Sequence, residues 1–94
     1  MNERFHIHLI SDSTGETTLG VLKASIAQFE GVEVQEHIWP MVRSTAQMEK
    51  VIQEIKENPG PVIFTLVSAR LRQPLIEECT RLNVPCVSVL DPVI

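Results

Sequence analysis

Residues 5–17 read FHIHLISDSTGET, a strand-length apolar run followed directly by hydroxyl groups, a carboxylate and a glycine. The run from Phe5 to Ile10 is apolar enough for a central strand that is covered on both faces. A strand that turns into a helix in this way points several free backbone N–H groups at one place, where the helix dipole favours negative charge. The stretch therefore predicts the first βα unit of an α/β domain, with a candidate anion site at its turn.

Outward from this stretch, strand-length apolar runs alternate with segments whose apolar residues recur at helical spacing. Such alternation is typical of βαβ units around a parallel sheet. Right-handed crossovers then predict an α/β fold in three layers: a four-stranded parallel sheet in the order 2-1-3-4 with three helices, an incomplete doubly wound domain. The expected strands are residues 5–10, 32–39, 61–67 and 85–90, and the expected helices are residues 15–30, residues between 44 and 58, and residues from about 70–73 to 82.

Local signals refine this scheme. Glu33 and Glu36 interrupt the apolar character of the second strand, which indicates an edge position. Ser44-x-x-Gln47 matches a capping box, and residues 58–60 (Asn-Pro-Gly) end the helix that it starts. In the third helix, Pro74 is tolerated only within the first turn, which is why the start is expected at residues 70–73. Asn83 can adopt the left-handed conformation that stops this helix.

The fourth strand is then an open edge with apolar surface left to cover. Exposed parallel edges are uncommon because they invite pairing. Either the molecule associates with a copy of itself, or these residues belong to a longer protein. We interpret residues 1–94 as a single N-terminal α/β domain of a longer protein, and a homodimer stays open.

Composition excludes several classes of partner. The net charge of −4 and a pI near 5.3 provide no basic field for nucleic acid or an anionic membrane. No apolar run approaches the roughly 20 residues that span a bilayer, so we expect a cytoplasmic protein. Cys79 and Cys86 lack the spacing of a zinc site and are expected as buried, reduced thiols. His6, His8 and His37 could approach one another on neighbouring strands, but no carboxylate is spaced to complete a metal site, and half-buried strand histidines are the better interpretation.

The turn after the first strand carries the candidate site. Ser13-x-x-Glu16 alone matches a capping box, which needs no ligand. The anion-binding interpretation gains support from the arginines that follow later strands, because the carboxyl ends of parallel strands share one edge, and guanidinium groups match phosphate geometry. The candidate anion-binding residues are Ser13, Thr14, Gly15, Glu16, Thr17, Arg43, Arg70 and Arg72, and Asp12 is a possible base or helix cap. No residue is assigned as catalytic, and neither a P-loop nor a dinucleotide motif is present.

Two stretches resemble one protein family. The segment from His8 to Thr17, HLISDSTGET, resembles the opening signature of the pyruvate, phosphate dikinase regulatory proteins, which include the phosphoenolpyruvate synthase regulatory proteins. A later segment agrees, and the likeness covers essentially the whole chain. The residues of that later segment, similar to the family's third helix and fourth strand, are Leu71, Arg72, Leu75, Cys79, Val84, Pro85, Cys86, Val87, Leu90 and Pro92.

The resemblance implies a bifunctional regulatory enzyme. Members phosphorylate a threonine of the target with ADP as donor, and remove that phosphate with inorganic phosphate as acceptor, releasing pyrophosphate. The family's P-loop lies beyond the aligned region. This implies that the C-terminal P-loop kinase domain is absent here, that ADP and inorganic phosphate are substrates of the full-length serine/threonine protein kinase, and that the fragment binds no cofactor and is inactive alone.

Two other classes of function stay open. The chain could be a non-enzymatic domain that docks on the target or forms a dimer, with the turn serving only as a helix cap. It could also be a free-standing anion-binding module. Within the resembled family, the sequence leaves both pyruvate, phosphate dikinase and phosphoenolpyruvate synthase as targets.

Overall fold

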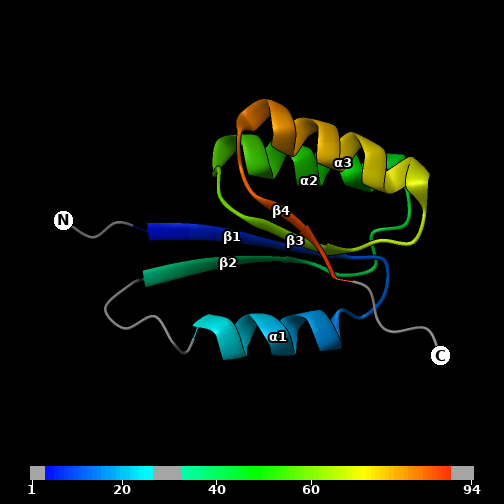
Figure 1. The fold of residues 1–94 in the computed structure, drawn as a ribbon. Helices are drawn as coiled ribbons and strands as arrows, with labels where there is room; N and C mark the ends of the chain where they lie inside the picture. Colours follow the sequence, from blue (N-terminus) through cyan, green and yellow to red (C-terminus); the bar gives the residue numbers. More distant parts are fainter. Residues whose placement is uncertain (1–3, 27–32, 90–94) are drawn as a thin grey trace.

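The computed structural model describes residues 4–26 and 33–89, and these residues form an α/β fold (Figure 1). The expected parallel sheet in the order β2-β1-β3-β4 is confirmed, as are the three helices. Its elements, in chain order, are β1 (Arg4–Ser11), α1 (Glu16–Ile26), β2 (Glu33–Trp39), α2 (Thr45–Glu57), β3 (Val62–Thr65), α3 (Ala69–Leu82) and β4 (Cys86–Ser88).

Strand β1 lies inside the sheet and pairs in parallel with β2 on one side and β3 on the other. Its register with β2 runs from Arg4 opposite Glu33 to Ile10 opposite Trp39. As expected, β2 is an edge strand, and β4 forms the other edge. Strands β3 and β4 are shorter than the predicted 61–67 and 85–90, and residue 90 lies outside the described residues.

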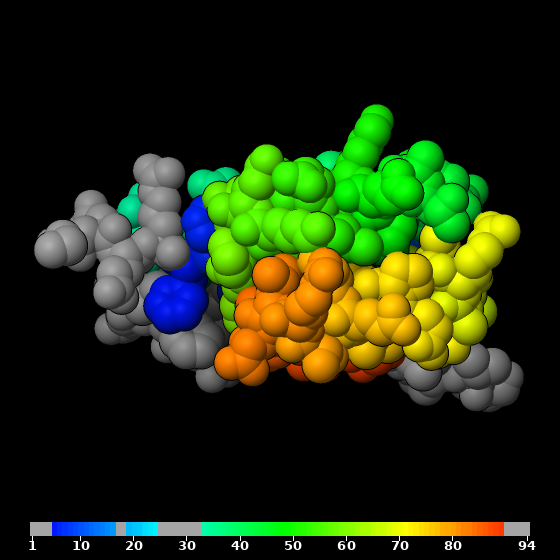
Figure 2. Space-filling view, turned by 90° about the horizontal axis from the view of Figure 1, so that it is seen from above, coloured from blue at the N-terminus to red at the C-terminus, as the bar shows by residue number. Residues whose placement is uncertain are grey.

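The helices divide between the two faces of the sheet. Figure 1 shows α2 and α3 together over one face and α1 alone under the other, and Figure 2 shows α2 and α3 side by side from above. Right-handed crossovers require this division, because the chain runs one way from β1 to β2 and the other way from β2 to β4. The main hydrophobic core lies under α2 and α3 and consists of Ile10, Val42, Met48, Val51, Ile55, Val62, Phe64, Leu66, Leu71, Leu75 and Cys79.

Helix α2 follows its sequence signals closely. The Ser44 side chain accepts the Gln47 backbone N–H at 3.2 Å, and the Gln47 side chain accepts the Ser44 N–H at 3.1 Å. The predicted capping box is therefore confirmed. The helix ends at Glu57, and the Asn58 N–H still donates to the Glu54 carbonyl at 2.9 Å.

Helix α3 corrects one expectation. It begins at Ala69, ahead of the predicted start, so Pro74 lies in the second turn instead of the first. The Leu71 and Arg72 N–H groups both donate to the Ser68 carbonyl, which establishes the helix before the proline. Pro74 has no N–H to donate to the Arg70 carbonyl, so one helical hydrogen bond is missing. The helix tolerates this loss because both residues lie on its exposed side. The predicted left-handed stop is confirmed at Asn83, with φ 58°.

Helix α1 and the two thiols complete the described fold. The predicted helix at residues 15–30 is observed from Glu16 to Ile26, and residues 27–30 lie outside the described residues. Cys79 is buried and Cys86 half-buried, both as free thiols, and burial raises the pKa of Cys79 to about 12. Within residues 4–26 and 33–89, no helix has the length and apolar character needed to cross a membrane.

Candidate functional site

The bend between β1 and α1 (residues 11–15) is hydrogen-bonded on both sides, toward β2 and toward β3. The Ser11 and Ser13 carbonyls accept N–H groups from Val42 and Met41, each at 2.9 Å, on the β2 side. On the β3 side, the Asp12 N–H donates to the Thr65 carbonyl at 3.2 Å. The bend therefore lies at the carboxyl edge of the sheet between two strand ends, which is where ligands of open α/β sheets gather.

The start of α1 differs from the predicted capping box. The first helical hydrogen bond runs from the Leu19 N–H to the Gly15 carbonyl at 2.8 Å, so Gly15, with φ 74°, holds the N-cap position. The Ser13 carbonyl is taken by Met41, and the Ser13 hydroxyl lies 3.1 Å from the Ser11 hydroxyl. Ser13 is therefore two residues too early to cap the helix. The Ser13-x-x-Glu16 match was wrong as a capping box because the chain needs a glycine turn between strand and helix.

Ser11 is a residue of the bend that sequence reasoning missed. Its side chain is buried, and its Oγ accepts the Ser13 N–H at 3.1 Å. This local side-chain bond to the backbone two residues later is the mark of a Ser/Thr turn. The available signal was a hydroxyl at the last position of an apolar run, directly before a turn.

Asp12 joins the bend to the loop after β3. Its Oδ2 accepts the Val67 N–H at 2.9 Å, and its carbonyl accepts Arg43 Nε at 3.0 Å. The carboxylate therefore stabilises the β3–α3 loop, and Gly15 occupies the N-cap position of α1 that Asp12 was a candidate to serve. The other carboxylate oxygen takes no part in this hydrogen bond, so a role of Asp12 as a base stays a hypothesis.

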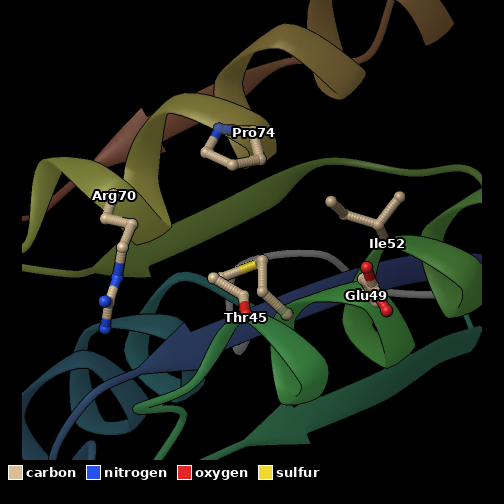
Figure 3. A pocket seen from close by; sticks show the side chains of 6 residues that line it. Thr45, Glu49, Ile52, Arg70 and Pro74 are labelled. Carbon is tan, nitrogen blue, oxygen red and sulfur yellow. The ribbon is translucent and has the colours of Figure 1, made fainter.

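The structure separates the three arginines. Arg43 contacts the bend through Asp12, whereas the hydrogen bonds of the described residues connect neither Arg70 nor Arg72 to it. Arg70 instead lies at a pocket between the N-terminal halves of α2 and α3 (Figure 3). Arg72 is half-buried, with a buried Nε that has no partner among the described residues. The residues that line the pocket are Thr45, Met48, Glu49, Ile52, Arg70 and Pro74.

The remaining candidates are open to solvent. Ser13, Thr14 and Glu16 are exposed and Gly15 is half-buried, while the side chain of Thr17, inside α1, lies outside what the structure describes. The first N–H groups of a helix have no partner within it, so α1 directs them at the bend. Together with the hydroxyls and the Arg43 guanidinium, they can hold an oxyanion. Within the described part of the chain, no group of three or more His, Cys, Asp or Glu side chains is placed to hold a metal ion.

Comparison with known proteins supports the family resemblance of the opening stretch. A model of the family described as kinase/pyrophosphorylase matches residues 7–94, nearly the whole chain, including most of β1, the bend and α1. The chain belongs to the kinase/pyrophosphorylase family.

Three similar proteins carry the same name. Proteins named as pyruvate, phosphate dikinase regulatory proteins from Rhizorhabdus wittichii and Erythrobacter litoralis are 54% and 50% identical over 91 residues, 97% of this chain and 33% of each relative. A protein of the same name from Rhodospirillum rubrum is 49% identical over 88 residues, 94% of this chain and 32% of its own length. The chain thus spans about a third of the length of the curated relatives it matches.

Proposed function

We propose that this chain is the N-terminal domain of a bifunctional enzyme that regulates pyruvate, phosphate dikinase. The match to the kinase/pyrophosphorylase family over residues 7–94 supports this proposal, together with about 50% identity to proteins named as regulators of that dikinase. In the kinase reaction the hydroxyl oxygen of a target threonine attacks the β-phosphorus of ADP, the bond from that phosphorus to the bridging oxygen breaks, the hydroxyl loses its proton and AMP leaves. In the reverse regulation, inorganic phosphate attacks the phosphorus of phosphothreonine, the bond to the threonine oxygen breaks, that oxygen takes a proton and pyrophosphate leaves.

In this proposal the bend after β1 binds a phosphate group, either inorganic phosphate or the phosphothreonine of the target. Three features support it: the exposed Ser13 and Thr14 hydroxyls, the N-terminus of α1, and Arg43 held against the bend by its bond to Asp12. Each is a donor or a positive charge suited to phosphate oxygens. The ADP site lies in the part of the full-length enzyme outside this chain.

A second candidate function, docking on the target protein, has its own support. Met41 and Val67, whose N–H groups bond to Ser13 and Asp12, flank the bend from the β2 and β3 sides. These two residues are 42% and 75% exposed, so large apolar residues lie at the surface on both sides of the bend. In this alternative, the flanks bind an apolar part of the dikinase and the bend takes no part in phosphoryl transfer.

One chimera tests both functions. Residues 1–94 replace the matching third of the Rhizorhabdus wittichii protein, and phosphorylation and phosphorolysis of the dikinase are followed with radiolabelled ADP and phosphate. We expect Arg43→Ala to slow phosphorolysis about 10- to 100-fold, because a charge-assisted hydrogen bond contributes about 1.5–3 kcal/mol. The matched control Arg70→Ala, which removes an arginine outside the bend, should stay within about two-fold of the parent rate.

The other outcomes separate the alternatives. A Met41→Ser variant that raises only the KM for the dikinase, with unchanged rates in Arg43→Ala and Thr14→Ala, would assign the region to docking. Parent rates in all three variants would remove the bend from both functions. A chimera that transfers no phosphoryl group, although it folds, would contradict the proposed regulatory enzyme.

A further inference from the structure

The three histidines of the chain gather at one place, away from the bend. His6 and His8 lie on β1, two residues apart, and point to the face covered by α2 and α3, as does their neighbour Ile10 of the core. His37 on β2 is opposite His8 in the parallel register. Its ring lies 4.6 Å from the His8 ring, nearly parallel, and 5.1 Å from the His6 ring. Every imidazole in the chain therefore belongs to this cluster.

A carboxylate on α2 extends the cluster into a chain of hydrogen bonds. Glu54 Oε1 lies 2.9 Å from His37 Nδ1, and His37 Nε2 lies 2.9 Å from His6 Nδ1. A carboxylate accepts, so His37 Nδ1 carries a proton. The contact between the two rings then needs one proton between its two nitrogens.

The surroundings of His8 exclude an added proton from its ring. Its Nε2 donates to the Asn58 carbonyl at 2.7 Å, which leaves Nδ1 without a proton. The side chain is fully buried, and Nδ1 has no partner among the described residues. Burial lowers the pKa of His8, with His37 and His6 adding in the same direction while the bond to Asn58 and the charge of Glu54 oppose it. A proton on Nδ1 would place an unpaired charge between the sheet and α2.

The cluster joins three separate parts of the fold. It connects central strand β1, edge strand β2 and the end of α2, where Asn58 begins the loop to β3. That loop also touches β1 through Gly60, which lies against the His6 main chain. Opening of this region would free the His8 imidazole to bind a proton that the closed arrangement excludes.

We propose that His6, His8, His37 and Glu54 form a proton-operated clasp that holds β2 and the α2–β3 loop on β1 while His8 is neutral and releases them when His8 gains a proton in acid. The charged and titratable groups that face His8 from β1, β2 and α2 are His6, His37 and Glu54. The closed clasp offers no partner to a proton on His8 Nδ1, and the open clasp exposes that nitrogen to water. Opening is therefore linked to the uptake of one proton.

The size of the effect follows from this count. A free imidazole with an ordinary pKa of about 6.5 is about ten-fold more often protonated than neutral at pH 5.5. One excluded proton should favour opening about ten-fold between pH 7.5 and pH 5.5. A clasp that excludes no proton should open to the same extent at both pH values.

Amide hydrogen exchange of the 94-residue chain, resolved by NMR and corrected for intrinsic rates, tests the proposal. The measured quantity is the opening constant of β2 relative to β3, because global unfolding changes both strands by the same factor. In the parent chain this ratio should rise about ten-fold from pH 7.5 to 5.5. In His8→Gln, whose amide can still donate to Asn58 but does not titrate, it should stay within about two-fold.

A second pair of variants keeps the test independent of how well His8→Gln folds. Glu54→Gln replaces a charge-assisted bond by a neutral one and should raise β2 opening several-fold at pH 7.5. Glu49→Gln, on the same helix but at the pocket beside Arg70, should leave β2 opening unchanged. A β2-to-β3 ratio independent of pH, or the same pH dependence in His8→Gln as in the parent, would overturn the clasp. Equal effects of the two glutamine variants would overturn it as well.

Discussion

Alanine at Gly60 should destabilise the fold, whereas alanine at Gly20 should stabilise it. A Cβ at residue 60 would stand 1.8 Å from the His6 carbonyl oxygen and 2.8 Å from its carbonyl carbon. These are backbone atoms of a central strand, so they cannot rotate away. A Cβ at residue 20, on the exposed side of α1, would meet nothing within 4 Å. The same substitution at two positions thus tests two opposite predictions.

The magnitude at Gly60 has two parts. Forcing an extra methyl group into a packed contact costs about 1–3 kcal/mol. The loop would also have to move away from β1, straining the bonds from the His8 N–H to the Pro61 carbonyl at 2.9 Å and from His8 Nε2 to the Asn58 carbonyl at 2.7 Å. Each contributes about 1 kcal/mol, so we expect a loss of about 4 kcal/mol for Gly60→Ala. Gly20→Ala should gain about 1 kcal/mol, because alanine is the better helix former.

Urea unfolding followed by circular dichroism at pH 7.5 measures both changes in the free energy of unfolding. A loss of about 4 kcal/mol is a large share of the stability of an ordinary domain, so Gly60→Ala should show a strongly lowered midpoint. The reasoning would be refuted if Gly60→Ala lost less than about 1 kcal/mol, the low end of the overpacking range. It would also be refuted if both variants changed in the same direction.

Two further predictions concern the helices on the other face. Ser44→Ala should cost about 1 kcal/mol because the Gln47 N–H loses its capping acceptor; an unchanged urea midpoint would show that the remaining Gln47 bonds hold the helix start alone. The pKa of Glu78 is lowered, first by the hydrogen bond from Arg81 and then by the charges of Arg81 and Lys56, so its contribution to stability is present above its ordinary pKa of 4.5 and lost as the pH falls through the lowered value. Glu78→Gln should therefore flatten the loss of stability below pH 4.5, as measured by thermal unfolding across pH, and an equally steep loss would contradict this assignment.

The sequence predicted the sheet order and the helix positions because both depend on patterns within single segments. The apolar run after Pro61 and the helical spacing around Met48 each indicate one element, and crossover handedness then permits few arrangements. Capping at Ser44 and the left-handed Asn83 are equally local, and both are confirmed.

Contacts between segments were harder to predict. The approach of the histidines followed from strand adjacency, but the part of Glu54 depends on how α2 is rotated over the sheet, which no spacing within α2 reveals. Arg43 and Arg70 both follow strands, yet among the hydrogen bonds of the described residues only that of the Arg43 side chain reaches the bend, because the direction of a long side chain is set by its neighbours. The capping-box match at Ser13 failed because Met41, distant in sequence, takes its carbonyl.

Because Gly15 stands at the start of α1, the backbone of this turn begins the helix and its side chains are not needed for that. Because the Gly15 main chain accepts the first helical hydrogen bond, the Thr14 hydroxyl is not needed to begin the helix. Thr14 is exposed, and its hydroxyl makes no hydrogen bond among the described residues. A substitution at residue 14 would therefore be nearly invisible to a screen for folded protein. Selective pressure seen there in a screen for regulatory activity would report on chemistry alone.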